Sequence, residues 1–438
     1  MLELRPFQVA TVKEMLNFLT TGEAHAVYNA SEMGLGKSIE TIATLESLNF
    51  KKVLIICPAV MRLVWRDEIN KWAKHTHNIF VIANGADSKK SFMHTAEWVI
   101  VSYDLAAKEA ITAKLLAKEF ECIVLDESHM VKTSRAKRTK AVLKTLWPKI
   151  PYRIALSGTP FTSSVMDGYT LFSRMLPSAF TGWADFANRY SYSRPTPWGM
   201  KYYGVKNHEE LSKIIRKYFY VRYTKDEVLT ELPDKTYQRV ALGYEYLLKV
   251  PKTEAEKLKQ QMEVLQAAVQ RGETLPVISD AIASQRRLQA ELKVPAIVEF
   301  VVDKLEQEIP IVVFSWHTSV LMNLYQALAK YNPAVIYGAT AQAKRMEEIK
   351  RFQSGETNLF IGNMAAAGVG ITLTRASTVV LAELDWSPSV ISQAVDRCHR
   401  IGQKDAVTVY YFVVNDSLEE SIIETVMQKV EAFNKVLD

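Results

Sequence analysis

The sequence is poor in the features that mark disulfide-rich, zinc-binding and membrane proteins. It has 3 cysteines in 438 residues, and Cys57, Cys122 and Cys398 are not at metal-binding spacing. Its 8 histidines show no zinc pattern. No apolar run approaches a transmembrane helix, and Met1 is not followed by a signal peptide. We therefore expect a reducing compartment, the cytoplasm, with no disulfide framework and no membrane partner.

Low-complexity segments and short repeats are also lacking. Hydrophobic residues make up 48% and charged residues 23% of the chain, as in an ordinary globular protein, and the length allows two or three domains. The net charge is +6, which permits a polyanionic partner without requiring one.

Residues 31–38, Ser-Glu-Met-Gly-Leu-Gly-Lys-Ser, end in the core of a phosphate-binding loop. The glycines let backbone N–H groups approach phosphate oxygens, Lys37 reaches the outer phosphates, and the Ser38 hydroxyl can bind Mg²⁺. The helix expected from Ile39 to Leu48 would point its N-terminus at the anion. Ser31 stands where the general pattern has glycine, so a glycine-rich turn is the alternative for this segment alone.

An apolar segment at residues 121–125 predicts a buried parallel strand, and Asp126-Glu127-Ser128-His129 follows it. Carboxylates at the carboxyl end of such a strand lie where α/β sheets bind ligands. We expect Asp126 to hold Mg²⁺ through water and Glu127 to orient and deprotonate the attacking water. An isolated acidic turn is the alternative, and the upstream phosphate loop favours the metal site. Ser128 and His129 are not predicted to be a hydrolase pair, because no nucleophile elbow surrounds them.

Residues 393–403 read Gln-Ala-Val-Asp-Arg-Cys-His-Arg-Ile-Gly-Gln. Arg397 and Arg400 are three residues apart and would share one face of a helix. Two forked, permanently charged guanidinium groups suit a triphosphate and can stabilise charge on a transferring phosphoryl group.

These motifs, in this order, resemble superfamily-two helicase-like ATPases of the sucrose-non-fermenting (chromatin-remodeller) type. The likeness runs over nearly all 438 residues. Ser31 and Ser38 replace the family's Asp and Thr, Ser128 stands where Ala or Gly is usual, and the ATP-site changes keep the needed donor. Four more segments match: Leu4-Arg5-Pro6-Phe7-Gln8, Cys57-Pro58 with Trp65 and Trp72, Leu156-Ser157-Gly158-Thr159-Pro160, and Ala367-Gly368-Val369-Gly370-Ile371-Thr372-Leu373.

The resemblance implies roles for individual residues, with ATP and Mg²⁺ as cofactors. The implied catalytic residues are Lys37, Asp126, Glu127, Arg397 and Arg400, and the implied metal ligands are Ser38 and Asp126. The implied nucleotide contacts are Arg5, Gln8, Met33, Gly34, Leu35, Gly36, Lys37, Ser38, Gly370 and Gln393. The implied contacts to the backbone of the tracked DNA strand, which carry no base information, are Arg62, Ser102, Thr159, Ser315 and Arg345.

Other segments resemble the annealing-helicase and fork-remodelling branch: Arg189-Tyr190, Pro197-Trp198-Gly199, Leu232-Pro233-Asp234-Lys235, Lys293-Val294-Pro295-Ala296 and Ala382-Glu383-Leu384-Asp385-Trp386. This likeness implies a monomeric DNA-dependent ATPase that translocates along or remodels double-stranded DNA without sequence specificity. Forked or branched DNA stays open. The compact chain suggests a bacterial or phage source.

Two other functions remain as alternatives. A strand-separating DNA or RNA helicase would use the same motor, but separation needs a wedge, and the sequence identifies none. A DNA-binding scaffold with a decayed ATPase is disfavoured because the five catalytic positions are intact.

Alternating strand and helix patterns predict an α/β fold of two RecA-like lobes, each a mostly parallel sheet flanked by helices. We expect an ATP-binding lobe at 1–235 with a helical protrusion at about 161–235, and a C-terminal lobe at 236–438 with a helical segment at about 250–295. Residues 161–295 show no strand-like runs. The expected strands are Val53 to Cys57, Trp98 to Ser102, Cys122 to Leu125, Arg153 to Leu156, Ile311 to Phe314, Ala334 to Ile336, Leu359 to Ile361, Thr378 to Leu381 and Val407 to Phe412.

Two basic segments have open interpretations. Residues 130–153 contain eight basic and no acidic residues, which suits either phosphate contact or a solvated helix. Residues 194–206 mix Arg194, Lys201 and Lys206 with aromatic residues. They could stack on bases and brace phosphates, or form a small satellite core under a loop, and we favour proximity to DNA.

Overall fold

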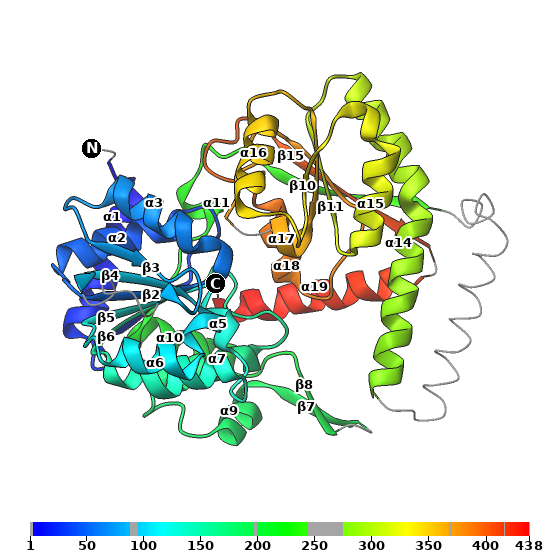
Figure 1. Cartoon of the computed structure of the whole chain (residues 1–438). Helices are drawn as coiled ribbons and strands as arrows, with labels where there is room; N and C mark the ends of the chain where they lie inside the picture. The colour runs from blue at the N-terminus through cyan, green and yellow to red at the C-terminus, as the bar shows by residue number, and fades with distance from the viewer. Residues whose placement is uncertain are drawn as a thin grey trace. The chain divides into compact units, whose positions relative to one another are not determined.

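The computed structural model describes residues 3–87, 95–196, 199–242, 275–367, 370–415 and 417–437. The chain divides into two compact units (Figure 1). Unit 1 comprises Met1–Ser193, Tyr202–Thr230 and Glu431–Asp438, and unit 2 comprises Arg194–Lys201 and Glu231–Val430. The division after residue 235 stays a prediction. Most of the expected helical segment at 250–295, and Pro197, Trp198, Gly368 and Val369, lie outside the described residues.

Unit 1 is built on a seven-stranded sheet in the order β3-β4-β2-β5-β6-β1-β9, in which every recorded pair is parallel. The strands are β1 (Ala26–Asn29), β2 (Val53–Cys57), β3 (Ile79–Val81), β4 (Trp98–Ser102), β5 (Cys122–Asp126), β6 (Tyr152–Leu156) and β9 (Tyr220–Val221). The four strands expected in this lobe are confirmed. The sequence did not predict β1, β3 and β9, which have 4, 3 and 2 residues.

Successive strand residues point to opposite faces of the sheet, so helices can cover both. In β2, for example, Leu54 and Ile56 belong to one apolar cluster, and Val53 and Ile55 to the other. The helices of unit 1 are α1 (Pro6–Thr21), α2 (Lys37–Ser47), α3 (Arg62–Trp72), α5 (Tyr103–Ala106), α6 (Glu109–Leu116), α7 (Lys137–Thr139), α8 (Tyr169–Met175), α9 (Trp183–Tyr190), α10 (His208–Tyr218) and α11 (Lys225–Val228). Shorter turns are η1 (Ala59–Met61), η3 (Ser128–Val131), the π-helical η4 (Lys140–Leu146), η5 (Trp147–Lys149) and η6 (Val165–Gly168).

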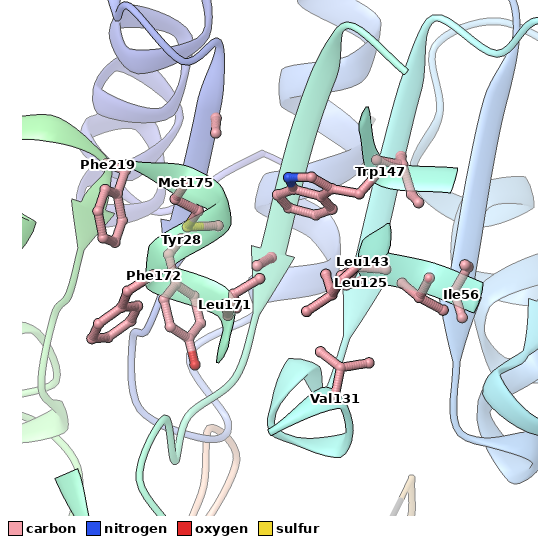
Figure 2. Packing of buried hydrophobic residues seen from close by; sticks show 14 of the residues in the cluster. Tyr28, Ile56, Leu125, Val131, Leu143, Trp147, Leu171, Phe172, Met175 and Phe219 are labelled. Atoms are coloured by element: carbon pink, nitrogen blue, oxygen red, sulfur yellow. The ribbon is translucent and has the colours of Figure 1, made fainter. Parts of the chain in front are cut away.

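Figure 2 shows part of one of these clusters, where side chains of β2 and β5 lie beside η4 and the side chain of Tyr28 in β1 lies beside α8. Leu143 and Trp147 pack over Leu125 and Ile56, and Phe172 lies beside Tyr28 with ring centroids 6.1 Å apart. Helices α1, α2 and α3 cover the other face through residues such as Met15, Ile42 and Ile69. The sheet is therefore buried on both sides, as its continuous apolar strands predict.

Unit 2 has a six-stranded sheet in the order β10-β15-β14-β11-β13-β12, also parallel in every recorded pair. The strands are β10 (Lys235–Leu242), β11 (Ile311–Ser315), β12 (Ala334–Ile336), β13 (Leu359–Asn363), β14 (Thr378–Leu381) and β15 (Val407–Val414). The helices are α14 (Leu275–Glu306), α15 (Thr318–Ala327), η7 (Ala329–Tyr331), α16 (Gln342–Gln353), α17 (Met364–Ala367), α18 (Pro388–Val395) and α19 (Leu418–Leu437). The five strands expected here are confirmed, as is the two-lobe α/β architecture.

The expectation that residues 161–295 contain no strands was wrong. Strand β9 completes the first sheet, β10 pairs with β15 over eight residues, and β7 (Tyr192–Thr196) pairs with β8 (Gly199–Tyr203) in a separate two-stranded sheet. Strand β10 escaped detection because its first five residues, Lys-Thr-Tyr-Gln-Arg, show no apolar alternation, and five of its eight residues are exposed.

The last turns of α19 belong to unit 1. Phe433, Val436 and Leu437 are buried in its core, and the ring of Phe433 lies 5.7 Å from that of Phe161. Among the described residues, no helix combines the length and apolarity needed to cross a membrane.

A buried carboxylate near the end of α2 is held by two histidines. His75 Nδ1 lies 2.7 Å from Glu46 Oε2, and His77 Nε2 is hydrogen-bonded to Glu46 Oε1. The His77 ring stacks on Trp98 with centroids 4.3 Å apart. Burial alone raises the pKa of Glu46, but the hydrogen bonds from His77 and His75 outweigh it and lower that pKa.

Replacing Glu46 with Gln should lower the free energy of unfolding by about 1–3 kcal/mol at neutral pH, because buried hydrogen bonds are lost. Because the pKa of Glu46 is lowered in the folded state, its ionised carboxylate stabilises the folded protein at pH values above the ordinary glutamate pKa of 4.5. This stabilisation is lost as the pH falls through the pKa that Glu46 has in the folded state. Denaturant titrations from about pH 6 to about pH 3 should therefore show a difference between wild type and variant that shrinks as the pH falls below the ordinary glutamate pKa. Glu97→Gln, at a carboxylate that is 40% exposed, is the control. A difference that stays constant with pH would contradict this account.

Candidate functional site

Three loops that carry the sequence motifs follow three neighbouring strands of unit 1. Strands β1, β6 and β5 are adjacent, and Leu156 is in register with both Asn29 and Asp126. Because parallel strands end at the same edge of a sheet, the chain leaves all three at one place. The phosphate loop, the Ser-Gly-Thr-Pro segment and the acidic pair are thereby brought together at this edge of the sheet.

The phosphate loop is shaped by two glycines in the left-handed region. Gly34 has φ 89° and Gly36 has φ 97°, conformations that other residues rarely adopt. A Cβ at Gly36 would lie 2.4 Å from Gln8 Nε2, so a side chain there would have to push the Gln8 amide aside. Gln8 Nε2 donates to Leu35 O at 2.9 Å, and Gln8 Oε1 accepts from Arg5 N at 3.0 Å. The segment that contains Arg5 and Gln8, which were predicted to contact the nucleotide, is thus fixed against the loop.

Lys37 opens α2 and lies inside its own loop. Its Nζ donates to Ser31 O at 2.6 Å and to Glu32 O at 3.0 Å. Burial lowers the pKa of Lys37, while the negative charges of Glu127, Glu40 and Asp126 oppose that shift. The ammonium is therefore held where oxygen acceptors surround it, as a phosphate-binding lysine requires.

Glu40 is a buried acid that sequence reasoning missed. It lies in the first turn of α2, and Asn29 Nδ2 donates to it at 2.7 Å. Burial raises the pKa of Glu40 to about 7, against the hydrogen bond from Asn29 and the charge of Lys37. The pair ties the end of β1 to the start of the phosphate-loop helix.

Asp126 ends β5 with both carboxylate oxygens in use. Trp65 Nε1 donates to Oδ2 at 2.8 Å, and Glu127 N donates to Oδ1 at 3.0 Å. Burial and the neighbouring Glu127 raise the pKa of Asp126, and the bond from Trp65 and the charge of Lys37 oppose them. In the sequence Trp65 was only part of a matching family segment and had no role of its own, whereas in the structure it orients the predicted metal ligand from α3.

Glu127 adopts φ 49°, a strained conformation for a residue with a side chain. Its Oε2 lies 3.3 Å from His129 Nδ1, and the same nitrogen lies 3.1 Å from Ser157 Oγ. Ser157 Oγ also accepts from Thr159 N at 3.2 Å. Glu127 is therefore in contact with His129, and His129 is hydrogen-bonded to the Ser-Gly-Thr-Pro segment, in which Thr159 was predicted to touch DNA.

Space around Lys37 is closed by that same segment. A Cβ on Gly158 would meet Met33 Cγ at 2.7 Å and Lys37 Nζ at 3.2 Å. Any side chain at Gly158 must displace the phosphate loop or its lysine. Met33, Gly158 and Lys37 thus pack as one unit at the edge of the sheet.

The carboxylate of Asp126 and the hydroxyl of Ser38, at the start of α2, are oxygen donors of the kind that Mg²⁺ takes. Asp126 is already oriented by Trp65, as ligands of protein metal sites usually are by a second group. These residues fit the predicted Mg²⁺ site.

In unit 2 the helical expectation for Arg397 and Arg400 was wrong. Helix α18 ends at Val395, and both arginines lie in the turns that follow. The helix stops because Arg397 O accepts from Leu373 N at 2.8 Å, while Cys398 N bonds back to Val395 O at 2.9 Å. The Arg397 Nε donates to Gln393 O at 3.1 Å.

The turns that carry the two arginines are tied to the preceding motif. Arg400 Nη1 donates to Ile371 O at 3.3 Å, and Gln403 Nε2 donates to Ala376 O at 2.8 Å. Gly370, predicted to touch nucleotide, has φ 72° beside this contact. The last two sequence motifs therefore form one structure within unit 2.

Most residues predicted to touch DNA have partners inside their own unit. Arg62 donates to Ile82 O at 2.7 Å and to Ala83 O at 2.9 Å. Ser102 is buried and caps α5 by accepting from Leu105 N at 3.4 Å. Arg345 is buried and donates to the carbonyls of Thr340, Ala366 and Tyr337. Ser315 is fully buried at the end of β11. Their contacts with DNA stay predictions, and their structural roles are plain.

Sequence reasoning did not single out Glu383, which orders the loop after β11. Its Oε2 accepts from Trp316 N at 2.8 Å and from His317 N at 2.9 Å, and its Oε1 lies 2.5 Å from His317 Nδ1. The resemblance to the fork-remodelling branch had included this position without giving it a role.

In the basic segment at 130–153, Lys132 and Arg153 point inward. Arg153 donates to Trp147 O and Ala24 O, both at 3.0 Å, and Lys132 is hydrogen-bonded to Thr162. Lys137 and Lys140 are exposed beside a groove between α6 and η4. The segment is thus neither wholly solvated nor wholly available to phosphates.

Comparison with known families gives two matches. The SNF2-related domain matches residues 10–268, and the helicase conserved C-terminal domain matches residues 292–402. The first match alone covers more than half of the chain.

Individual relatives are similar over almost the whole chain. The Xenopus laevis SWI/SNF-related matrix-associated actin-dependent regulator of chromatin subfamily A-like protein 1 is 30% identical over 99% of this chain and 44% of its own length. The human DNA annealing helicase and endonuclease ZRANB3 is 28% identical over 93% of this chain and 38% of its own length. The chain thus spans less than half of each relative. Both are animal proteins and give no support to the expected bacterial or phage source.

Among solved structures, the Sulfolobus solfataricus SWI2/SNF2 ATPase core in complex with dsDNA is similar with a TM-score of 0.47 and 24% identity. The alignment covers 100% of this chain and 95% of that one.

If Trp65 orients the metal ligand, Trp65→Phe should raise the Mg²⁺ concentration that half-saturates nucleotide binding, on the order of tenfold. Phe keeps most of the packing and loses the donor to Asp126. Trp98→Phe is the matched control, because Trp98 is also fully buried and its Nε1 has no hydrogen-bond partner among the described residues. Equal Mg²⁺ responses from the two variants, measured by titration, would show that Trp65 only fills space.

Proposed function

We propose that this chain, which belongs to the SNF2-related domain family and is a helicase-like ATPase, uses ATP hydrolysis to move along double-stranded DNA. One observation carries the proposal. The phosphate loop, the acidic pair and the Ser-Gly-Thr-Pro segment follow three adjacent parallel strands and are joined through Lys37, Gly158, His129 and Ser157. Such a linked edge can pass a change at the phosphates to the segment that contains Thr159.

In this proposal each residue of the edge has a defined task. The loop amides and Lys37 hold the phosphates, and Asp126 and Ser38 supply ligands for Mg²⁺, which would neutralise charge on the phosphates when bound. Glu127 orients a water molecule and takes its proton. Its strained backbone and its contact with His129 fix the carboxylate for that task. Arg5 and Gln8 set the position of the base.

The proposal extends to two residues of unit 2. Arg397 and Arg400 would supply positive charge to the phosphoryl group during hydrolysis, with Gln393 and Gly370 in the same structure. Their planar guanidinium groups suit this role, since each can donate two parallel hydrogen bonds. The DNA contacts would come from backbone-directed groups such as Arg62 and Thr159, which makes binding independent of base sequence.

A strand-separating helicase on DNA or RNA is the alternative within the same class of motor. Measuring hydrolysis with duplex DNA, single-stranded DNA and RNA as activators distinguishes the two. Nothing in the family relationship favours RNA.

Double-stranded DNA should stimulate hydrolysis, and the DNA affinity should fall steeply with salt because lysines and arginines displace counterions from phosphates. Lys37→Ala should abolish turnover while the protein stays folded, since it removes the cation that serves the phosphates. The matched control is Lys71→Ala, an exposed lysine of α3 beside Trp72. A salt-independent affinity, or a strong preference for one duplex sequence, would rule out tracking along the backbone.

Arg400→Ala should leave ATP binding nearly intact and reduce turnover by a factor on the order of 10³ or more, as for an arginine that acts only in the transition state. Arg400→Lys should restore little, because lysine lacks the planar fork. Nucleotide binding by fluorescence and hydrolysis by phosphate release measure the two effects separately. Turnover within tenfold of wild type would show that hydrolysis does not need this residue.

A further inference from the structure

The segment that follows β9 lies along the first half of the phosphate loop. Strand β9 is a parallel neighbour of β1, and the backbone contacts between them continue beyond the ends of both strands. Ala30 N donates to Val221 O at 2.8 Å, and Glu32 N donates to Tyr223 O at 3.0 Å. The two segments are nearly two hundred residues apart in the sequence, so the fold alone brings them together.

Arg222 strengthens this contact with its side chain, of which only 7% is exposed. Its Nη1 donates to Ala30 O at 3.0 Å. Its Nη2 lies 4.0 Å from Glu32 Oε1. One buried cation therefore spans from the residue before the phosphate loop to the second residue of that loop.

Two backbone N–H groups of the same segment hold side chains of the loop. Ser31 Oγ accepts from Tyr223 N at 3.3 Å, and Glu32 Oε2 accepts from Lys225 N at 2.9 Å. Ser31 is fully buried and stands where the family has Asp, and its hydroxyl serves here as the acceptor. Residues 30–32 are therefore held from the side of β9 by residues 222–225.

The same peptides also place the lysine that is proposed to bind phosphate. The carbonyls of Ser31 and Glu32 accept from Lys37 Nζ at 2.6 Å and 3.0 Å. Burial is the main cause of the lowered pKa of Lys37, and the positive charge of Arg222 contributes to that shift, so the two cations are close enough to interact. A displacement of residues 30–32 would therefore move the lysine as well as the loop.

We propose that Arg222 is a positioning residue for ATP, which holds residues 30–32 so that the phosphate loop has its binding shape before the nucleotide arrives. This inference rests on the proposed function and deepens it. Gly34 and Gly36 make the second half of the loop pliable, since glycine has access to many backbone conformations. A loop that is ordered in advance loses less entropy on binding. Arg222 thus contributes to the affinity for the triphosphate without touching it.

The same segment also contacts the helix that carries a predicted nucleotide contact. The Tyr223 hydroxyl donates to Glu14 Oε1 at 2.6 Å, and Gln8 lies in the same helix, α1. Tripolyphosphate, which has no base, distinguishes the two routes. If Arg222 acts on the phosphate loop, its loss must weaken ATP and tripolyphosphate by the same factor.

The test measures ligand binding to the full chain with Mg²⁺ and without DNA, using a fluorescent ATP analogue and competition by ATP or tripolyphosphate. Arg222→Ala should raise both dissociation constants on the order of tenfold, because a buried hydrogen bond from a charged group is lost. In hydrolysis assays with saturating duplex DNA, KM should rise by the same factor. The kcat should stay within about threefold of wild type, since Arg222 is not among the groups proposed to act on the water or the transferring phosphoryl group.

Two further variants test the same contact more gently. Arg222→Lys should recover most of the affinity, because a hydrogen bond to the single carbonyl of Ala30 does not need the planar fork. Ser31→Ala breaks the contact from the loop side and should weaken both ligands by about threefold, the effect of one neutral hydrogen bond.

Arg153→Ala is the matched control. Arg153 also donates to two carbonyls, those of Trp147 and Ala24, both at 3.0 Å. It lies near the start of β6, at the edge of the sheet opposite to the phosphate loop. Its loss should lower the melting temperature about as much as the loss of Arg222 and leave both dissociation constants unchanged.

The outcomes separate this inference from the proposed function. Wild-type ligand affinity in Arg222→Ala, while duplex DNA still stimulates hydrolysis, overturns the inference and leaves the proposed function standing. A weakening of ATP without a weakening of tripolyphosphate assigns Arg222 to the base contact and also overturns it, and so does an equal loss of affinity in Arg153→Ala. If Arg222→Ala does not fold, unchanged affinity in Ser31→Ala overturns the inference. Failure of the wild type to bind ATP overturns the inference and the proposed function together.

Discussion

Parallel pairing of β1, β6 and β5 at one register is the constraint on which the site in unit 1 depends. Leu156 pairs with Asn29 of β1 on one side and with Asp126 of β5 on the other, so the loops after these three strands begin at the same edge of the sheet. A slip of one residue between parallel strands would turn every side chain to the opposite face of the sheet. The apolar alternation that buries both faces therefore also fixes where Lys37, Asp126 and Gly158 meet.

Gathering charges at that edge has a cost that the structure offsets locally. Burial lowers the pKa of Lys37 and raises the pKa of Asp126, so each group would be easier to neutralise if it stood alone. The opposite charges around each residue act against that tendency, and so do the hydrogen bonds from Trp65 to Asp126 and from Lys37 to the carbonyls of Ser31 and Glu32. Carbonyl oxygens occupy the acceptor role that phosphate oxygens would take, which lets a buried ammonium stay charged.

The sequence predicted the motifs and the strands that precede them, because both leave strong local signals. A mostly apolar segment such as residues 121–125, followed by Asp126, predicts both a buried strand and the position of its carboxyl end. Contacts between distant residues leave no such signal. The hydrogen bonds from Trp65 to Asp126 and between His129 and Ser157 join residues that are far apart in the sequence. No sequence motif predicts such contacts, since they depend on the order of the strands in the sheet.

Short or exposed strands were missed for a different reason. Strand β9 has two residues, and β7 and β8 bury neither face, so no apolar alternation marks them. The helix predicted through Arg397 and Arg400 failed because a long-range bond, from Leu373 N to Arg397 O, competes with the helical pattern. Helix propensity is a local preference, and a tertiary contact overrode it here.

The composition of unit 1 also decides which experiments can isolate its chemistry. Phe433, Val436 and Leu437 complete its core from the end of α19, while Ile422 of the same helix packs in the core of unit 2. A fragment that ends near Pro233 therefore lacks three buried side chains and uncovers Phe161. Removing one large buried side chain typically costs about 3–5 kcal/mol, a large part of the stability of a whole domain. Loss of hydrolysis in such a fragment would follow from unfolding as readily as from the missing arginines. A single substitution at Arg400 leaves the core of unit 1 complete, so a loss of hydrolysis in that variant can be assigned to the arginine itself.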